Sequence, residues 1–177
     1  VDTISIMNNC DIAGRQLINA RLIPISTLSK IRYGIAVASV ANKLLFAGGY
    51  TYYPFVASSR VDIFDINTNL WTTAELSKAR TNITTAVVGN KIFFAGGDEE
   101  NNSSSRVDIY NALTNTWSTA ELSIARSLMA GDAIGNKVFF AGGKIASYFN
   151  DASDRVDIYN SSTNTWSTTT LTDHKFD

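Results

Sequence analysis

The sequence contains one segment three times: a lysine, a short apolar run and a pair of glycines. The copies occupy residues 43–49, 91–97 and 137–143 and read KLLFAGG, KIFFAGG and KVFFAGG. A unit repeated at this interval folds as a repeat architecture, in which the copies bury their apolar surfaces against one another. The repeat therefore constrains the fold more than any other feature. The repeated glycine pairs are Gly48 and Gly49, Gly96 and Gly97, and Gly142 and Gly143.

Two further markers follow each glycine pair. The sequence Arg-Val-Asp-Ile-aromatic begins at Arg60, Arg106 and Arg155, and a tryptophan follows each of these arginines 11 positions later, at Trp71, Trp117 and Trp166. Between the glycine pair and the arginine the copies differ in length, with 10, 8 and 11 residues. Insertions are tolerated in surface connections and excluded where strands must keep their register. This segment is therefore predicted to be an exposed loop in every copy.

Each unit is predicted to contain four short antiparallel strands. The first alternates small and apolar side chains, and the second is the apolar run that ends in the glycine pair. The third contains Arg-Val-Asp-Ile-aromatic, and a Thr-Asn turn leads into a fourth that opens with tryptophan. No long amphipathic helix is indicated. The predicted first strands are residues 32–40, 80–88 and 126–134.

Tight turns are predicted between the first two strands. Gly89-Asn90 and Gly135-Asn136 are residues that adopt a positive φ at low cost, as a two-residue hairpin requires. Ala41-Asn42 is a weaker signal at the same place in the first copy.

These features resemble the kelch repeat, in which a hydrophobic run ends in Gly-Gly and an aromatic residue precedes a tryptophan by seven positions. The pairs Phe64/Trp71, Tyr110/Trp117 and Tyr159/Trp166 keep that spacing. The resemblance implies an all-β propeller of kelch type with four-stranded antiparallel blades, in which the aromatic residue and the tryptophan pack between neighbouring blades. It also implies a function as an interaction scaffold, as in most members of that family, or as an enzyme, as in a minority.

The whole chain, residues 1–177, is interpreted as one propeller segment. Three complete blades are predicted at residues 32–73, 80–119 and 126–168, the outer strands of a preceding blade at 1–27, and the start of a further blade at 171–177. Because propellers have about four to eight blades, these parts do not close a ring. The remaining blades are expected from a longer chain or from a second copy.

Charge and composition exclude several classes of partner. Fifteen Lys and Arg against sixteen Asp and Glu give a net charge of -1, so no basic field attracts nucleic acid. No apolar run approaches the length of a bilayer span, and membrane insertion is not expected. The single cysteine, Cys10, forms neither an internal disulfide nor a cysteine-based zinc site. No metal site and no cofactor are predicted.

Catalysis is not expected on this chain. The only histidine, His174, lies in the C-terminal tail, so a Ser-His-Asp triad on the blades is unavailable. No glycine-rich phosphate loop is present. The protein is therefore predicted not to be an enzyme. The alternative is a kelch-fold enzyme whose catalytic residues lie outside this chain.

The variable loops are the candidate binding site. Positions that are identical in all three copies are expected to serve packing, whereas residues that bind a partner are expected where the copies differ. The loops are expected at one end of the propeller, together with the links between blades. Aromatic rings beside carboxylates suit a partner with apolar and cationic groups, or a sugar. A protein partner is favoured, and a glycan is the alternative. The candidate residues are Tyr50, Tyr52, Tyr53, Phe55, Asp98, Glu99, Glu100, Tyr148 and Phe149.

Two further expectations follow from composition and repetition. Arg60, Arg106 and Arg155 are interpreted as ion-paired or stacked side chains rather than as an anion-binding ring. The lightly charged surface, rich in Ser, Thr and Asn, resembles that of extracellular or cell-surface kelch proteins of microbes. A cytoplasmic location is the alternative.

Overall fold

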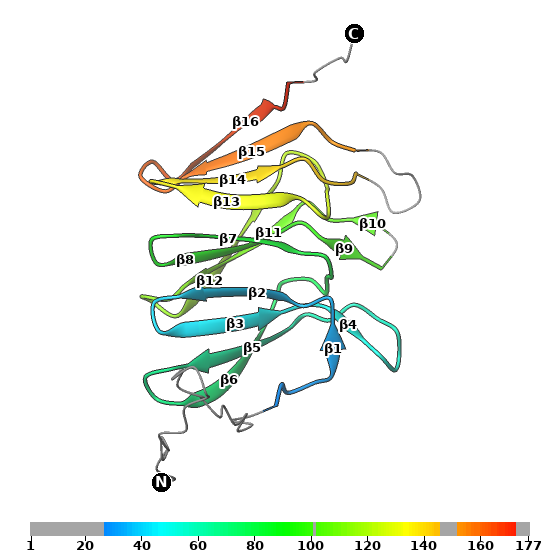
Figure 1. Ribbon diagram of the computed structural model, residues 1–177, viewed down its shortest axis with the longest axis vertical. Helices are drawn as coiled ribbons and strands as arrows, with labels where there is room; N and C mark the ends of the chain where they lie inside the picture. The colour runs from blue at the N-terminus through cyan, green and yellow to red at the C-terminus, as the bar shows by residue number, and fades with distance from the viewer. Residues whose placement is uncertain (1–26, 101, 146–151, 173–177) are drawn as a thin grey trace, which may run out of the picture.

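The structure, a computed structural model, describes residues 27–100, 102–145 and 152–172, and all regular elements in these ranges are β-strands. Each repeat forms one four-stranded antiparallel sheet whose strands follow chain order, as predicted (Figure 1). The first sheet contains β2 (Ala36–Val40), β3 (Lys43–Ala47), β5 (Arg60–Asp65) and β6 (Leu70–Glu75). The second contains β7 (Thr84–Val88), β8 (Lys91–Ala95), β11 (Arg106–Asn111) and β12 (Thr116–Glu121). The third contains β13 (Ala130–Ile134), β14 (Lys137–Ala141), β15 (Arg155–Asn160) and β16 (Thr165–Thr170).

Two short ribbons lie beside these sheets. One pairs β1 (Arg32–Tyr33) with β4 (Tyr50–Thr51), and the other pairs β9 (Asp98–Glu99) with β10 (Asn102–Ser103). The partial blades predicted at residues 1–27 and 171–177 fall almost entirely outside the described residues.

The first strand of each sheet begins later than predicted. Strands starting at Arg32, Arg80 and Arg126 were expected, but the long strands start four residues further on. The backbone has a positive φ two residues after each arginine, which interrupts an extended strand. These residues are Gly34 (63°), Asn82 (51°) and Leu128 (54°).

The predicted hairpin turns are confirmed. Gly89 and Gly135 have φ values of 56° and 58°, and each hairpin pairs the residues on either side of a two-residue turn. Ala41 adopts the same conformation, with φ 52°, although alanine bears a Cβ that disfavours it. The Thr-Asn turns behave alike, with φ between 55° and 58° at Asn69, Asn115 and Asn164.

The core consists of two apolar layers between the three stacked sheets (Figure 1). Between the first and second sheets, Leu45 and Val61 belong to one cluster with Phe94. Between the second and third, Phe93 and Phe140 belong to another. Complete burial of a side chain of this size stabilises the fold by about 1.5–3 kcal/mol. The stacking therefore supplies the main stabilisation.

Trp117 and Trp166 pack at these layers, although they are half-buried rather than enclosed. Trp117 stacks on Phe94 with centroids 5.9 Å apart, lies 5.1 Å from Tyr110, and contacts the layer shared with the first sheet. Trp166 contacts the next layer in the same way. The aromatic residues thus join neighbouring sheets.

The glycine pairs allow successive repeats to approach closely. A Cβ added to Gly48 would lie 2.4 Å from the carbonyl oxygen of Arg80, and one added to Gly96 would lie 2.2 Å from that of Arg126. The next glycine donates a backbone hydrogen bond to the same oxygen, from Gly49 to Arg80 and from Gly97 to Arg126, each at 2.9 Å. The doublets are therefore structural.

Candidate binding surface

The first two variable loops, the described ends of the third and the links between sheets lie at one end of the molecule, opposite the tight hairpin turns (Figure 1). Residue pairing fixes this arrangement, because each link forms a β-bridge with a loop. Thr81 pairs with Asp98, and Ser127 pairs with Lys144. In the first repeat the pairing extends to the two-residue ribbon of β1 and β4.

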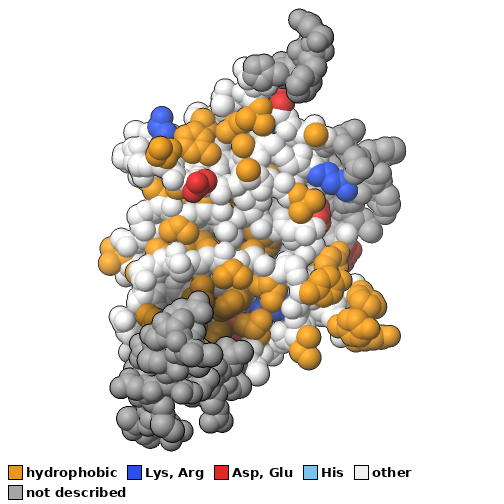
Figure 2. All heavy atoms as spheres, viewed as in Figure 1, with side chains coloured by type: hydrophobic (Ala, Val, Ile, Leu, Met, Phe, Trp, Pro, Cys, Tyr) orange, Lys and Arg blue, Asp and Glu red, His pale blue; other side chains and the backbone are white. Residues whose placement is uncertain are grey.

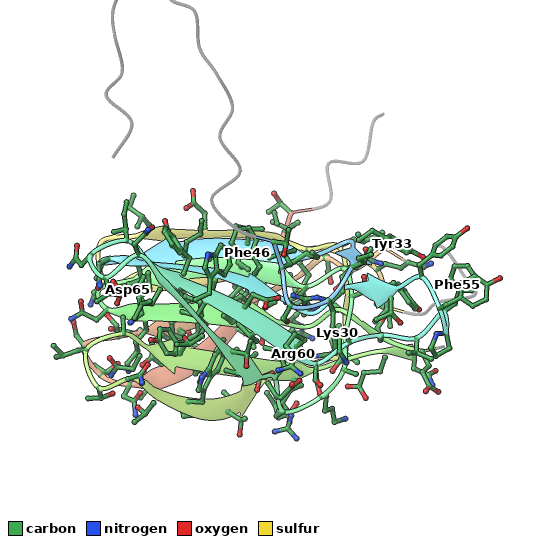
Figure 3. All side chains as sticks on the ribbon, turned by 90° about the horizontal axis from the view of Figure 1, so that it is seen from below. Lys30, Tyr33, Phe46, Phe55, Arg60 and Asp65 are labelled. Atoms are coloured by element: carbon green, nitrogen blue, oxygen red, sulfur yellow. The ribbon has the colours of Figure 1, made fainter. Side chains whose placement is uncertain are left out.

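Three aromatic side chains gather on the first variable loop. Tyr52, Tyr53 and Phe55 lie with ring centroids 5.3–5.7 Å apart, and each pair is tilted or edge-on. Their exposed fractions are 63%, 82% and 60%. These residues are called the aromatic cluster below. Figure 2 shows hydrophobic side chains protruding at this end, and Figure 3 places Phe55 at the tip of the loop.

The loop that carries the cluster is held by its own backbone. The amide of Thr51 donates to the carbonyl oxygen of Val56 at 3.1 Å, and the amide of Ser58 donates to that of Gly49 at 2.8 Å. Tyr50 is half-buried at the base of the loop, where it stacks on Tyr33 with centroids 5.8 Å apart. Tyr50 therefore supports the loop and lies apart from the exposed cluster.

Two of the three acidic candidates of the second loop, Asp98 and Glu99, are bonded to other side chains of the protein. Asp98 accepts a hydrogen bond from the side-chain amide of Asn82 at 2.8 Å. Glu99 pairs with Lys78 at 3.0 Å and accepts a hydrogen bond from the hydroxyl of Ser104. Burial alone would raise the pKa of Glu99, but the bonds from Ser104 and Lys78 outweigh it and hold the pKa below its usual value.

Glu100, the third acidic candidate, is exposed at a positive φ of 45°. It lines a cleft of about 450 Å³ between the first and second loops, together with Lys78 and Glu99. Tyr148 and Phe149, predicted on the third loop, lie outside the described residues. The structure thus brings the first-loop aromatics together and places the acids on the neighbouring loop.

Sequence reasoning missed three buried ion pairs in which arginines of the links bind aspartates of the third strands. The pairs are Arg32–Asp62, Arg80–Asp108 and Arg126–Asp157, and all three guanidinium groups are inaccessible to solvent. Both partners recur in the sequence, in Leu-Ser-x-x-Arg and Arg-Val-Asp-Ile, so the shared period was the available signal. Their repetition makes them structural residues.

Two of the three arginines that open the third strands form partly exposed ion pairs. Arg60 and Arg106 pair with Glu75 and Glu121 at 3.2 and 3.0 Å, as the sequence suggested. Arg155 lies opposite Thr170, which has no carboxylate.

In the described ranges no three His, Cys, Asp or Glu side chains come together in a way that could hold a metal ion. The same ranges contain no helix with the length and hydropathy to cross a membrane.

Comparison with known proteins agrees with the repeated geometry. A family model described as the kelch motif matches residues 79–121 and 125–170, which together make up half of the chain. These matches cover the second and third sheets with the link that precedes each. No curated protein matches the chain. The matched residues contain the glycine pairs, the aromatic–tryptophan spacing and the four-stranded sheets of the second and third repeats. The chain therefore belongs to the kelch-repeat family.

Proposed function

We propose that this protein is a non-catalytic kelch scaffold that binds a protein partner through the aromatic cluster. The three sheets are then consecutive blades of a propeller, and the variable loops form the recognition end. Kelch repeats commonly serve as protein-binding scaffolds, which agrees with this proposal.

The observation that carries the proposal is the exposure of the aromatic cluster. Large aromatic side chains are enriched at protein interfaces and supply a disproportionate share of their binding energy. Here three rings contact one another on a loop closed by backbone hydrogen bonds, so little conformational entropy remains to be lost on binding. Their exposure in the free protein leaves apolar area for a partner to cover.

The outer face of the third sheet supports the presence of further blades. Ile134, Phe139 and Ile158 are exposed or half-buried there. The equivalent residues of the second sheet, Val88, Phe93 and Ile109, are buried against the third. We propose that blades from a longer chain or from a second copy cover this face. The proposed location is extracellular or at the cell surface.

The proposal is tested with a variant in which Tyr52, Tyr53 and Phe55 are all replaced by Ala. The matched control replaces Ile66, Leu70 and Leu113, which are equally exposed but lie in or beside the turns at the opposite end. Proteins captured by the immobilised wild-type chain are quantified by mass spectrometry, together with binding to an oligosaccharide array.

We expect the aromatic variant to lose a specific protein that the wild type and the control both retain, with melting temperatures within about 2 °C of one another. Equal capture by all three chains would contradict the proposal. Array binding that depends on the cluster would assign the site to a glycan instead.

A further inference from the structure

A cleft of about 550 Å³ lies beside the aromatic cluster, between the first link and the first loop. This volume is in the range typical of ligand pockets. The lining is mainly apolar and includes one charged side chain, that of Lys30. The lining residues are Lys30, Ile31, Thr51, Tyr52, Tyr53, Pro54 and Val56.

The second repeat has a lysine at the position of Lys30. Lys30 and Lys78 both stand two residues before the buried arginine of their link. Lys78 is neutralised by Glu99, with both carboxylate oxygens within 3.1 Å of the ammonium nitrogen. In the second repeat, therefore, the charge of the link is satisfied by the loop of the same repeat.

The first repeat lacks that carboxylate. Thr51 occupies the position of Glu99, two residues after the glycine pair, and both residues lie in the short strand that follows it. Lys30 is exposed and forms no ion pair with any described residue. Figure 3 shows Lys30 at the same end of the sheet as Tyr33 and Phe55.

An ammonium group with no ion pair among the described residues, placed beside an apolar cleft, favours a ligand that combines a negative charge with an apolar group. The carboxylate would replace the missing partner of Lys30, and an apolar side chain would enter the cleft beside Tyr52 and Tyr53. Exclusion of water by the rings strengthens the attraction between the opposite charges. Uncharged or basic segments would leave Lys30 unpaired and are disfavoured.

We propose that this cleft binds a peptide segment of a protein partner in which an acidic residue adjoins a large apolar residue. The inference rests on the proposed function, since it names the partner chemistry of the same surface. It adds a specificity determinant, Lys30, that the aromatic cluster alone does not provide.

The test is selection from a displayed library of random 12-residue peptides on the immobilised protein. We expect enriched peptides to contain Asp or Glu next to an aromatic or large aliphatic residue. Synthetic versions of these peptides are then titrated against the variants Lys30→Met, Thr51→Glu and Thr51→Gln. Enrichment without acidic residues, or no enrichment, would overturn the proposal.

The substitution Thr51→Glu recreates the arrangement of Lys78 and Glu99, so an internal carboxylate competes for Lys30. Thr51→Gln is the matched control. Glutamine has the size of glutamate, and its introduction removes the same threonine hydroxyl without adding a charge. We expect Lys30→Met and Thr51→Glu to weaken peptide binding about tenfold, and Thr51→Gln to leave it within about twofold of the wild type. Equal affinities for Thr51→Glu and Thr51→Gln would overturn the role of Lys30.

Two arms separate the possible failures. Peptides whose binding requires the aromatic cluster but not Lys30 would refute the acidic specificity and leave the scaffold function intact. Peptides unaffected by loss of the cluster would refute the proposed function itself. Binding of an oligogalacturonate that depends on Lys30 would assign the cleft to an acidic glycan and overturn the peptide proposal.

Discussion

The guanidinium group of Arg80 and the carboxylate of Asp108 form an ion pair between a link and a central strand of the second sheet, with side-chain exposures of 0% and 3%. Arg80 also donates to the carbonyl oxygens of Arg106 at 2.6 Å and of Phe94 at 3.4 Å. Asp108 in turn accepts a hydrogen bond from the amide of Ser77 at 2.9 Å. One pair thus ties the incoming chain to two strands.

Removal of Asp108 should be strongly destabilising. Burial lowers the pKa of Arg80 and the charge of Asp108 opposes that effect, so Asp108→Ala leaves a buried cation without its counter-ion. We expect the free energy of unfolding to fall by about 3–5 kcal/mol. The control is Glu121→Ala, which removes the exposed partner of Arg106 and should cost less than about 1 kcal/mol. Urea unfolding measures both, and equal losses would contradict the structural role of the buried pair.

The first glycines of the second and third pairs, Gly96 and Gly142, offer a direct comparison. Gly96→Ala and Gly142→Ala impose similar backbone strain, because φ is 59° and 65°. An added Cβ meets the carbonyl oxygen of Arg126 at 2.2 Å in the first case, whereas in the second its nearest neighbour among the described residues is the carbonyl oxygen of Ser153 at 3.5 Å. Gly96→Ala should therefore lower the melting temperature by several degrees more than Gly142→Ala. Similar shifts in melting temperature would show that the close approach of the link to Gly96 does not determine the cost of the added Cβ.

Ala41 is a position where glycine should improve the protein. A left-handed conformation costs an L-residue about 1–2 kcal/mol, whereas glycine loses about 0.5–1 kcal/mol of additional chain entropy on folding. Ala41→Gly should raise the free energy of unfolding by roughly 0.5 kcal/mol, and the reciprocal change Gly89→Ala should lower it. Chemical denaturation measures the free energy of unfolding of both variants. A loss of stability in Ala41→Gly would contradict the claim that Ala41 is strained.

Lys43 and Asp65 make one hairpin end sensitive to acid. A hydrogen bond from Lys43 lowers the pKa of Asp65 to about 2, aided by bonds from Asn42 and two backbone amides. Because the folded pKa is below the unfolded value of about 3.9, the contribution of this pair is complete above about pH 4 and is lost as the pH falls toward 2. Lys43→Met should raise the pKa of Asp65, which an NMR titration of its carboxyl carbon would detect. An unchanged titration would show that the hydrogen bonds from Asn42 and the backbone amides alone lower the pKa of Asp65.

Local patterns predicted the sheets and turns because their causes are local. The glycine doublets, Gly89-Asn90 and the Trp spacing each report a backbone or packing requirement that recurs at a fixed interval. The arginine–aspartate pairs escaped because Arg80 and Asp108 are 28 residues apart, and only the fold brings them together. The late starts of the first strands were missed because a positive φ at Gly34, Asn82 and Leu128 interrupts the extended backbone, and Leu128 in particular gives no local signal of this conformation.

The binding surface was predictable by residue type but not in its detail. Aromatic and acidic side chains on variable loops indicated a recognition end. Which of them remain free depends on partners that periodicity does not reveal: Glu99 is bound by Lys78, and Tyr50 by Tyr33. The exposed position of Lys30 became informative only through comparison with its equivalent in the second repeat.

Site-specific photocrosslinking shows whether a protein partner is recognised at the aromatic cluster. A photoreactive phenylalanine derivative replaces Tyr53 in one chain and Leu113, at the opposite end, in another. We expect a single protein to crosslink from position 53 in proportion to its concentration, and the same protein to be absent from position 113. Equal labelling from both positions, or crosslinking from position 113 alone, would contradict recognition by the aromatic cluster.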